Sequence, residues 1–149
     1  MKTLVIIFSF LIAVSSYAFP MRGLEKGALI DLQKFSTKNG SALKDNSALK
    51  MLIVWSSDKR LSKKQYEVYS EFCTEEKVAC FAVDRNGDFH DDTDVVSAVD
   101  KNGYTETWGL ITIPVTIILN KDNKIIDAVG YEGQYKHKMR EVINNLKKQ

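Results

Sequence analysis

Residues 49–55 read Leu-Lys-Met-Leu-Ile-Val-Trp, and this stretch says most about the architecture of the chain. Every position but Lys50 is apolar. A short unbroken apolar run is typical of a strand that is buried on both faces, as in the centre of a parallel sheet. Residues 78–83 form a second run of this kind. Two buried strands separated by a helical segment predict an α/β core.

The segment between the two strands has helical periodicity. Tyr66, Tyr69, Phe72 and Cys73 fall on one face of a helix. Ser62-Lys63-Lys64-Gln65 has the form of a capping box, in which a hydroxyl caps the helix and a Gln follows three residues later. The sequence therefore predicts a helix that starts at Ser62 and buries its aromatic face.

Before the first strand, the pattern predicts an N-terminal β-hairpin. Residues 28–35 alternate loosely, Lys38-Asn39-Gly40 marks a tight turn, and residues 41–43 return. Asn-Gly supplies the positive φ angles that such turns require.

After the second strand, the sequence predicts four further elements and two turns. Residues 84–87 turn, and a short helix spans about 93–101 with Gly103 at its end. A strand over residues 112–119 contains Pro114, and residues 121–124 turn into a last strand over 125–131. An amphipathic helix closes the chain, with its apolar face formed by Tyr135, Met139, Val142, Ile143 and Leu146.

The N-terminus has the layout of a secretory signal. Lys2 precedes an apolar run over residues 4–14, and Ser16-Tyr17-Ala18 places small residues where a signal peptidase reads. Cleavage after Ala18 leaves one domain, residues 19–149, with a formal net charge of +1 once Lys2 is removed from the total of +2. An uncleaved membrane anchor or a buried helix is the alternative. The near-neutral charge argues against a basic surface that binds nucleic acid. No later apolar stretch is long enough to span a membrane.

Three segments resemble thioredoxin-like proteins, in particular the extracytoplasmic TlpA and ResA type and, more loosely, the peroxiredoxins. The resemblance lies in the opening region 30–55, in the loop Trp108-Gly109-Leu110-Ile111-Thr112-Ile113-Pro114-Val115-Thr116, and in the closing hairpin 117–130. It implies a thioredoxin fold, a central mixed sheet flanked by helices, here with the N-terminal hairpin as an extension. It also implies a cis peptide bond between Ile113 and Pro114.

The chain departs from these proteins at the redox motif. Their apolar strand ends in Trp, and Cys-x-x-Cys follows at the start of the first long helix. Aligning the helix start here puts Lys59 and Ser62 at the cysteine positions, and an alternative register puts Ser56 and Lys59 there. Hydroxyl and ammonium groups cannot replace the thiolate that attacks a disulfide. Both registers predict that thiol chemistry is absent at this site.

The two cysteines, Cys73 and Cys80, admit three interpretations. In an exported protein they favour a disulfide that joins the helix to the next strand. They could also be buried free thiols, or a displaced redox pair. The position of Cys73 on the apolar face of the helix argues against ready access by a substrate.

The proline loop is the candidate binding site. In thioredoxin-like proteins the backbone beside this proline pairs with an extended peptide, and such strand addition needs no cysteine. By this resemblance Ile113, Pro114, Trp55 and Trp108 form a peptide-binding region. The alternative is that Pro114 only shapes the loop and that both Trp side chains belong to the core.

Two charged stretches are weaker candidates for a functional site. Lys59, Arg60, Lys63 and Lys64 could hold an anion at the helix start, but a solvated surface is the simpler interpretation. The stretch 84–94 is rich in Asp and includes His90, but its spacing does not match a calcium loop. No metal or cofactor is expected.

The favoured hypothesis is therefore an exported, non-enzymatic thioredoxin-like protein that binds an extended polypeptide or an envelope protein near Pro114. The alternatives are a divergent thiol-disulfide oxidoreductase that uses Cys73 and Cys80, and a structural accessory protein. The resemblance suggests the periplasm, with the extracellular space as the other possibility.

Overall fold

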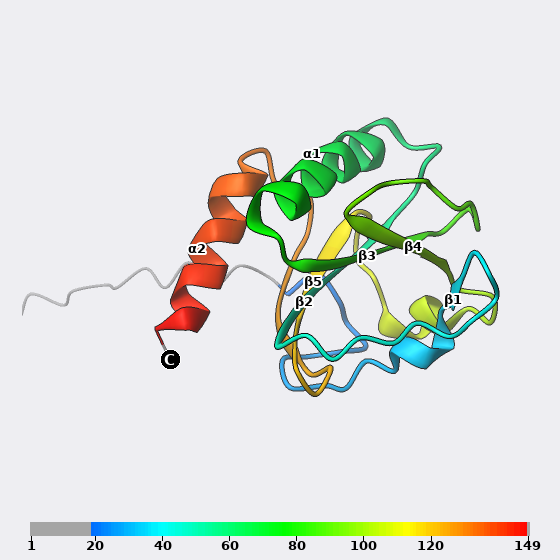
Figure 1. Cartoon of the computed structure of the whole chain (residues 1–149), viewed down its shortest axis with the longest axis horizontal. Coiled ribbons are helices and arrows are strands. Elements are labelled where there is room, and N and C mark those ends of the chain that lie inside the picture. The colour runs from blue at the N-terminus through cyan, green and yellow to red at the C-terminus, as the bar shows by residue number, and fades with distance from the viewer. Residues whose placement is uncertain (1–18, 149) are drawn as a thin grey trace, which may run out of the picture.

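The computed structural model describes residues 19–148, and the predicted signal at residues 1–18 lies outside the described residues. A six-stranded mixed sheet with the order β1-β4-β3-β2-β5-β6 forms the centre. The predicted class, an α/β thioredoxin fold, is confirmed (Figure 1). The strands are β1 Ser36–Thr37, β2 Leu49–Trp55, β3 Ala79–Asp84, β4 Val95–Val99, β5 Val115–Asn120 and β6 Ile125–Val129, and the helices are α1 Arg60–Glu76 and α2 Tyr135–Lys147, with 3₁₀ turns η1 Leu32–Lys34 and η2 Tyr104–Trp108.

Strand β2 occupies the predicted central position with the predicted bounds. It runs parallel to β3 and antiparallel to β5, so that Val54 lies opposite both Val83 and Val115. Lys50 is fully buried in this apolar strand. Its ammonium group donates to the carbonyls of Ser47 at 3.0 Å and Lys121 at 3.1 Å, which compensates for the loss of water.

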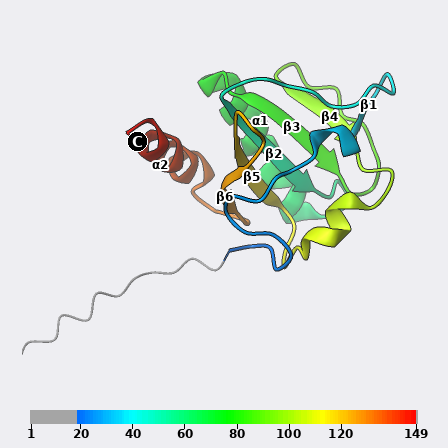
Figure 2. The ribbon, with the colours of Figure 1, turned by 90° about the horizontal axis from the view of Figure 1, so that it is seen from below.

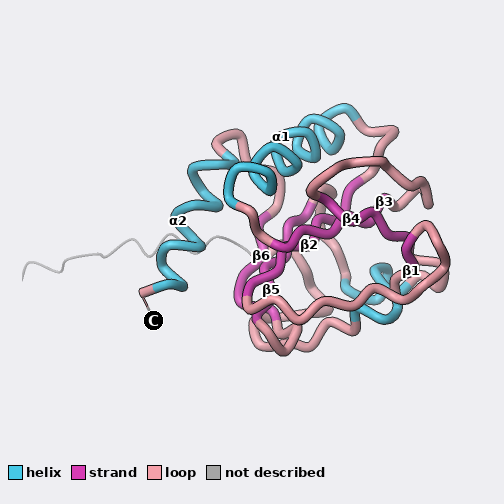
Figure 3. The backbone as a smooth tube through the Cα atoms, in the orientation of Figure 1, coloured by secondary structure: helices cyan, strands magenta, loops and turns pink. Residues whose placement is uncertain are grey.

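The two faces of the sheet carry separate hydrophobic clusters. Helices α1 and α2 cover one face, where Tyr69, Phe72 and Tyr135 are buried against the sheet. The N-terminal segment and η2 cover the other face (Figures 2 and 3). Phe35 and Trp108 pack edge to face there. Each face of the central strands is thus shielded from water, as their composition predicted. No helix within residues 19–148 is long and apolar enough to cross a membrane.

The predicted helix over residues 93–101 is wrong, because strand β4 forms there. Its β-branched residues Val95, Val96 and Val99 favour extended backbone, and β4 pairs with β3 in parallel register. Gly103 does not end a helix. It precedes η2, whose first N–H groups bind the Asp100 carboxylate.

The N-terminal hairpin is much shorter than predicted. Gly40 has the expected positive φ of 83°, so the turn is confirmed. Residues 32–34 form η1 instead of a strand, because the Asp31 carboxylate accepts from the N–H of Gln33. The return consists of a single bridge from Ser36 to Ala42, while β1 pairs with β4.

The predicted capping box is also wrong. Helix α1 begins at Arg60, with Lys59 as N-cap and no side-chain cap. Ser62 is buried, and its Oγ accepts from the N–H of Ser56 at 2.7 Å. Gln65 instead accepts from the N–H of Glu132 at 2.9 Å. Both side chains thus bind backbone N–H groups outside the helix and do not cap it.

Candidate functional site

One edge of the sheet gathers the residues that the sequence singled out. β2 and β3 both end there, at Trp55 and Asp84, and β5 begins there at Val115. The Ile113–Pro114 peptide bond that precedes β5 is cis. Because Val54 lies opposite Val115, continuing the antiparallel register places Ser56 opposite Ile113. The start of α1 and the proline loop are therefore neighbours.

The start of α1 carries no thiol. Lys59 is the exposed N-cap, and Ser62 lies in the first turn with its hydroxyl engaged by Ser56. Among the described residues, neither side chain is held by an ion pair or bond that would activate a nucleophile. The helix start can supply N–H groups and positive charge, but it has no group that can exchange with a disulfide.

The two cysteines lie far from this edge. Cys73 and Cys80 form a disulfide, with their Cα atoms 6.2 Å apart. Cys73 is 1 % exposed and Cys80 is 3 % exposed, so the bridge belongs to the core between α1 and β3. At 1.5 Å per residue, Cys73 is about 20 Å along the helix from Arg60. The bridge joins the far end of α1 to the sheet.

Neither Trp side chain is available to a peptide at the surface. Trp55 is 2 % exposed and stacks on Tyr66 at 4.0 Å between ring centres. Trp108 is 1 % exposed and lies in the cluster on the opposite face of the sheet. Both side chains belong to the hydrophobic core, Trp55 on one face of the sheet and Trp108 on the other. Pro114 is buried, and Ile113 is half-buried.

The backbone ahead of the proline is partly paired with the chain's own N-terminal segment. Arg22 and Gly23 donate to the carbonyls of Gly109 and Trp108, and the N–H of Ile111 donates to Pro20. Within residues 19–148, no hydrogen bond reaches the N–H or carbonyl of Ile113. The backbone of Ile113 therefore stays unpaired beside the cis-proline.

Exposed apolar side chains occur in three segments at this end of the sheet. Leu61 in the first turn of α1 is 52 % exposed, Ile111 is 53 % exposed, and Tyr131 after β6 is 41 % exposed. The bond from Glu132 to Gln65 holds the loop containing Tyr131 against α1. Backbone donors and acceptors next to apolar side chains are the features that strand addition uses.

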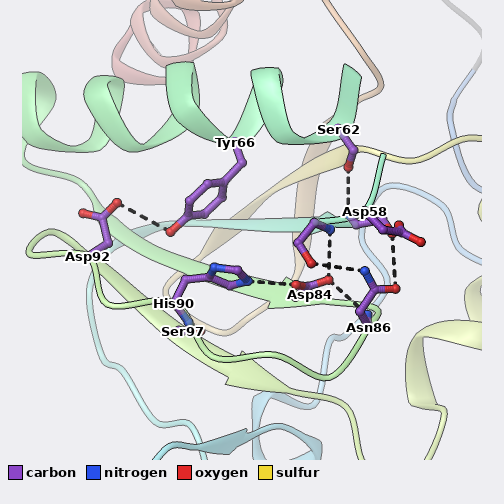
Figure 4. Close-up of polar contacts among 10 residues, drawn as sticks. Asp58, Ser62, Tyr66, Asp84, Asn86, His90, Asp92 and Ser97 are labelled. Atoms are coloured by element: carbon purple, nitrogen blue, oxygen red, sulfur yellow. Dashed lines mark hydrogen bonds and ion pairs between the residues drawn. The ribbon is translucent and has the colours of Figure 1, made fainter. Parts of the chain in front are cut away.

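A polar cluster beneath the start of α1 was not predicted as a unit. Asp84 is fully buried at the end of β3, and its carboxylate accepts from His90 Nε2 at 2.8 Å and from the N–H groups of Ser57 and Asn86 (Figure 4). Burial opposes the ionisation of Asp84, but these hydrogen bonds outweigh it and hold the pKa of the carboxyl below its ordinary value. The His90 ring packs against Trp55.

The loop between β3 and β4 is tied to α1 through Asp92. This carboxylate accepts from the hydroxyls of Ser70 and Tyr66, and Asp94 accepts from Thr74 (Figure 4 shows the Tyr66 contact). Burial, with the neighbouring Asp92 charge, raises the pKa of Tyr66, so its hydroxyl stays protonated and donates. Hydroxyls spaced along α1 bind acidic residues of the loop, a pairing that sequence spacing alone does not reveal.

The described residues place no side-chain hydroxyl within hydrogen-bond distance of the His90 ring in this polar cluster. No group of three or more metal-ligating side chains is found in residues 19–148. The cluster orders the loop and the start of α1.

Several solved structures of other proteins have a fold similar to that of this chain. A putative thiol:disulfide interchange protein DsbE from Chlorobium tepidum matches with a TM-score of 0.63 and 17% identity, over 82% of this chain and 97% of that one. The exposed lipoprotein thioredoxin Etrx1 of Streptococcus pneumoniae matches with a TM-score of 0.60 and 14% identity, over 74% and 96%. StoA from Bacillus subtilis matches with a TM-score of 0.56 and 16% identity, over 73% and 93%.

No protein-family model and no curated protein matches the sequence. The fold is therefore established by structure: the chain has the thioredoxin fold. The solved structures that share it include the C-terminal domain of a putative thiol-disulfide oxidoreductase from Bacteroides thetaiotaomicron and a peroxiredoxin-like protein from Aquifex aeolicus, in agreement with the resemblance drawn from the sequence.

Proposed function

We propose that this protein is an exported thioredoxin-fold module that binds an extended polypeptide by strand addition at Ile113, without thiol chemistry at the helix start. The unpaired backbone of Ile113 beside the cis-proline carries the proposal. An incoming strand would satisfy these groups and would cover Leu61, Ile111 and Tyr131. Lys59 and Ser62 occupy the places where related proteins carry cysteines, so the bound chain is held and not reduced.

Export is part of the same proposal. The first residues have the order of a secretory signal, and the solved structures of the same fold include one described as an exposed lipoprotein. A disulfide between Cys73 and Cys80 is the state expected outside the cytoplasm. The periplasm is the favoured compartment, and the extracellular space is the alternative.

Substitution of the exposed apolar side chains tests the binding site. Leu61→Glu and Ile111→Glu place a charge where a bound strand would bury an apolar side chain, so binding to an array of unstructured decapeptides should fall at least about tenfold. Leu29→Glu is the matched control, because Leu29 is 61 % exposed and pairs with Lys124 at the opposite end of β5. Equal binding by all three variants would exclude this site.

A thiol-disulfide oxidoreductase is the second candidate, since the chain keeps a disulfide within this fold. In that case a reduced Cys73/Cys80 pair would pass two electrons to a substrate disulfide and close into a bridge. The burial of both sulfur atoms opposes this reaction, because a substrate disulfide cannot reach them in the folded state.

Removing the bridge separates the two candidates. In the structural role, Cys73→Ala/Cys80→Ala loses about 2.5 kcal/mol of stability in urea unfolding and keeps peptide binding. In the catalytic role, the parent protein reduces insulin with dithiothreitol faster than the uncatalysed reaction, and the double variant does not. Insulin reduction by the parent would overturn the non-catalytic proposal.

A further inference from the structure

Four cations lie close together in sequence at the start of α1, beside the proposed binding edge. Lys59 and Arg60 are exposed at the start of α1, and Lys63 and Lys64 are exposed one turn later. None of the four forms a salt bridge within residues 19–148. Elsewhere on α1, Glu75 and Glu76 are paired with Lys136 and Arg140 of α2.

This arrangement opposes helix formation in two ways. Cations at a helix N-terminus repel the positive end of the helix dipole, and the first turn of α1 contains no acidic residue. Lys59 and Lys63, like Arg60 and Lys64, are also like charges four residues apart, which face each other on a helix. A local arrangement that costs stability is expected at functional positions.

The cations lie next to the unpaired backbone. Ser62 bonds to Ser56, and the register of β2 and β5 places Ser56 opposite Ile113. The nearby acidic groups are few. Asp58 accepts from Ser56 Oγ at 2.5 Å, and this bond and the neighbouring Lys59 hold its pKa low, so it stays charged. Glu132 is half-buried and accepts from the N–H of Gln134. Glu67, one turn after Lys63, is exposed, whereas the buried Asp84 carboxylate is engaged by Ser57, Asn86 and His90. Four exposed cations therefore face three carboxylates that solvent can reach, and the edge keeps a small positive charge.

Resting on the proposed function, we infer that the polypeptide bound at Ile113 is acidic. Its backbone pairs with Ile113, an apolar side chain packs on Leu61 and Ile111, and flanking Asp or Glu residues lie over the four cations. The carboxylates neutralise the charge repulsion within the first turns of α1. Charge complementarity of this kind raises the association rate and excludes basic competitors.

Three decapeptides test this inference. They share one apolar core, which is flanked by Glu in the first peptide, by Gln in the second and by Lys in the third. Fluorescence anisotropy measures the affinity of the protein for each peptide. The Glu peptide should bind roughly tenfold more tightly than the Gln peptide, and the difference should shrink between low salt and about 0.5 M salt. Changing Lys59, Arg60, Lys63 and Lys64 to Gln should reduce the affinity for the Glu peptide to that for the Gln peptide. The control changes four exposed lysines elsewhere, Lys44, Lys101, Lys121 and Lys124, and should leave the difference intact.

The outcomes separate this inference from the function on which it rests. Equal binding of the three peptides, or tightest binding of the Lys peptide, overturns the acidic preference but leaves strand addition standing. Failure of all three peptides to bind overturns both. The helix-start variant should also unfold at a higher temperature than the parent, because its substitutions remove repulsion at α1. A lower midpoint would show that the cations stabilise the fold, which contradicts the inference.

Discussion

At the scale of single residues, Asp84 shows how the site end of the sheet is organised. A fully buried carboxylate is costly unless it is well hydrogen-bonded, and Asp84 receives donors from Ser57, Asn86 and His90. Those donors come from the segment that leads into α1 and from the loop after β3. One side chain therefore fixes the relative position of two connections that border the binding edge.

We predict that Asp84→Asn lowers the free energy of unfolding at neutral pH by about 1.5–3 kcal/mol, the usual value of hydrogen bonds to a charged group. Because the folded pKa of Asp84 lies below its unfolded value of about 3.9, its contribution is present above that pH and is lost as the pH falls through the folded pKa. Urea unfolding at pH 7 and at about pH 3 measures the effect.

The exposed Asp88→Asn serves as the control, since it should leave stability unchanged. A difference between parent and Asp84→Asn that is as large at low pH as at neutral pH would mean that the charge of Asp84 is not what stabilises the fold.

At the scale of elements, the N-terminal segment behaves as an added edge to the proline loop. Arg22 and Gly23 bind the carbonyls of Gly109 and Trp108, and Met21 bridges to Leu110. The approach is close enough that a Cβ on Gly23 would lie 2.6 Å from the carbonyl oxygen of Thr107. The segment supports the loop up to Ile111, and the loop is free from there to the proline.

Gly23→Ala should therefore destabilise the protein by roughly 1–3 kcal/mol, since backbone atoms of η2 would have to move. Gly133→Ala is the matched control, because nothing lies within 4 Å of a Cβ there. Thermal unfolding of both variants measures the difference. If the two midpoints agree, the N-terminal segment does not pack on the loop in solution.

At the scale of the whole molecule, the thioredoxin fold is present and the start of α1 carries no cysteine. The sheet, the cis-proline and the long helix α1 are in place. The disulfide lies at the opposite end of α1, where it joins the helix to the sheet. Under the proposed function, the binding edge is made of backbone, whereas disulfide exchange needs two thiol side chains, so binding does not depend on those thiols.

Introducing Cys-x-x-Cys at the start of α1 should therefore give the protein disulfide-exchange activity. Lys59→Cys/Ser62→Cys places a thiol at the N-cap of α1, where the helix dipole and the remaining cations lower a cysteine pKa to about 7 or below. We expect dithiothreitol-driven insulin reduction to rise above the background rate only in this variant. A double variant that folds but stays inactive would show that the edge is not shaped for disulfide substrates.

Much of the architecture can be read from the sequence, because burial on both faces leaves a direct mark on composition. The run at residues 49–55 predicted β2 with its correct bounds, and Tyr135, Met139 and Ile143 predicted the buried face of α2. The absence of cysteine at Lys59 and Ser62 also follows from residue identity alone, since no conformation can give these side chains a thiol.

Long-range pairing settled the rest. Residues 95–99 form a strand because they pair with the edge of β3. Ser62 does not cap α1, because its hydroxyl oxygen accepts from the N–H of Ser56. The partnership of Asp84 with His90 and the free backbone of Ile113 likewise depend on segments that meet only in three dimensions. Local pattern reports which residues are buried, whereas the partner of each polar group is chosen by whichever distant segment the fold brings within hydrogen-bond distance.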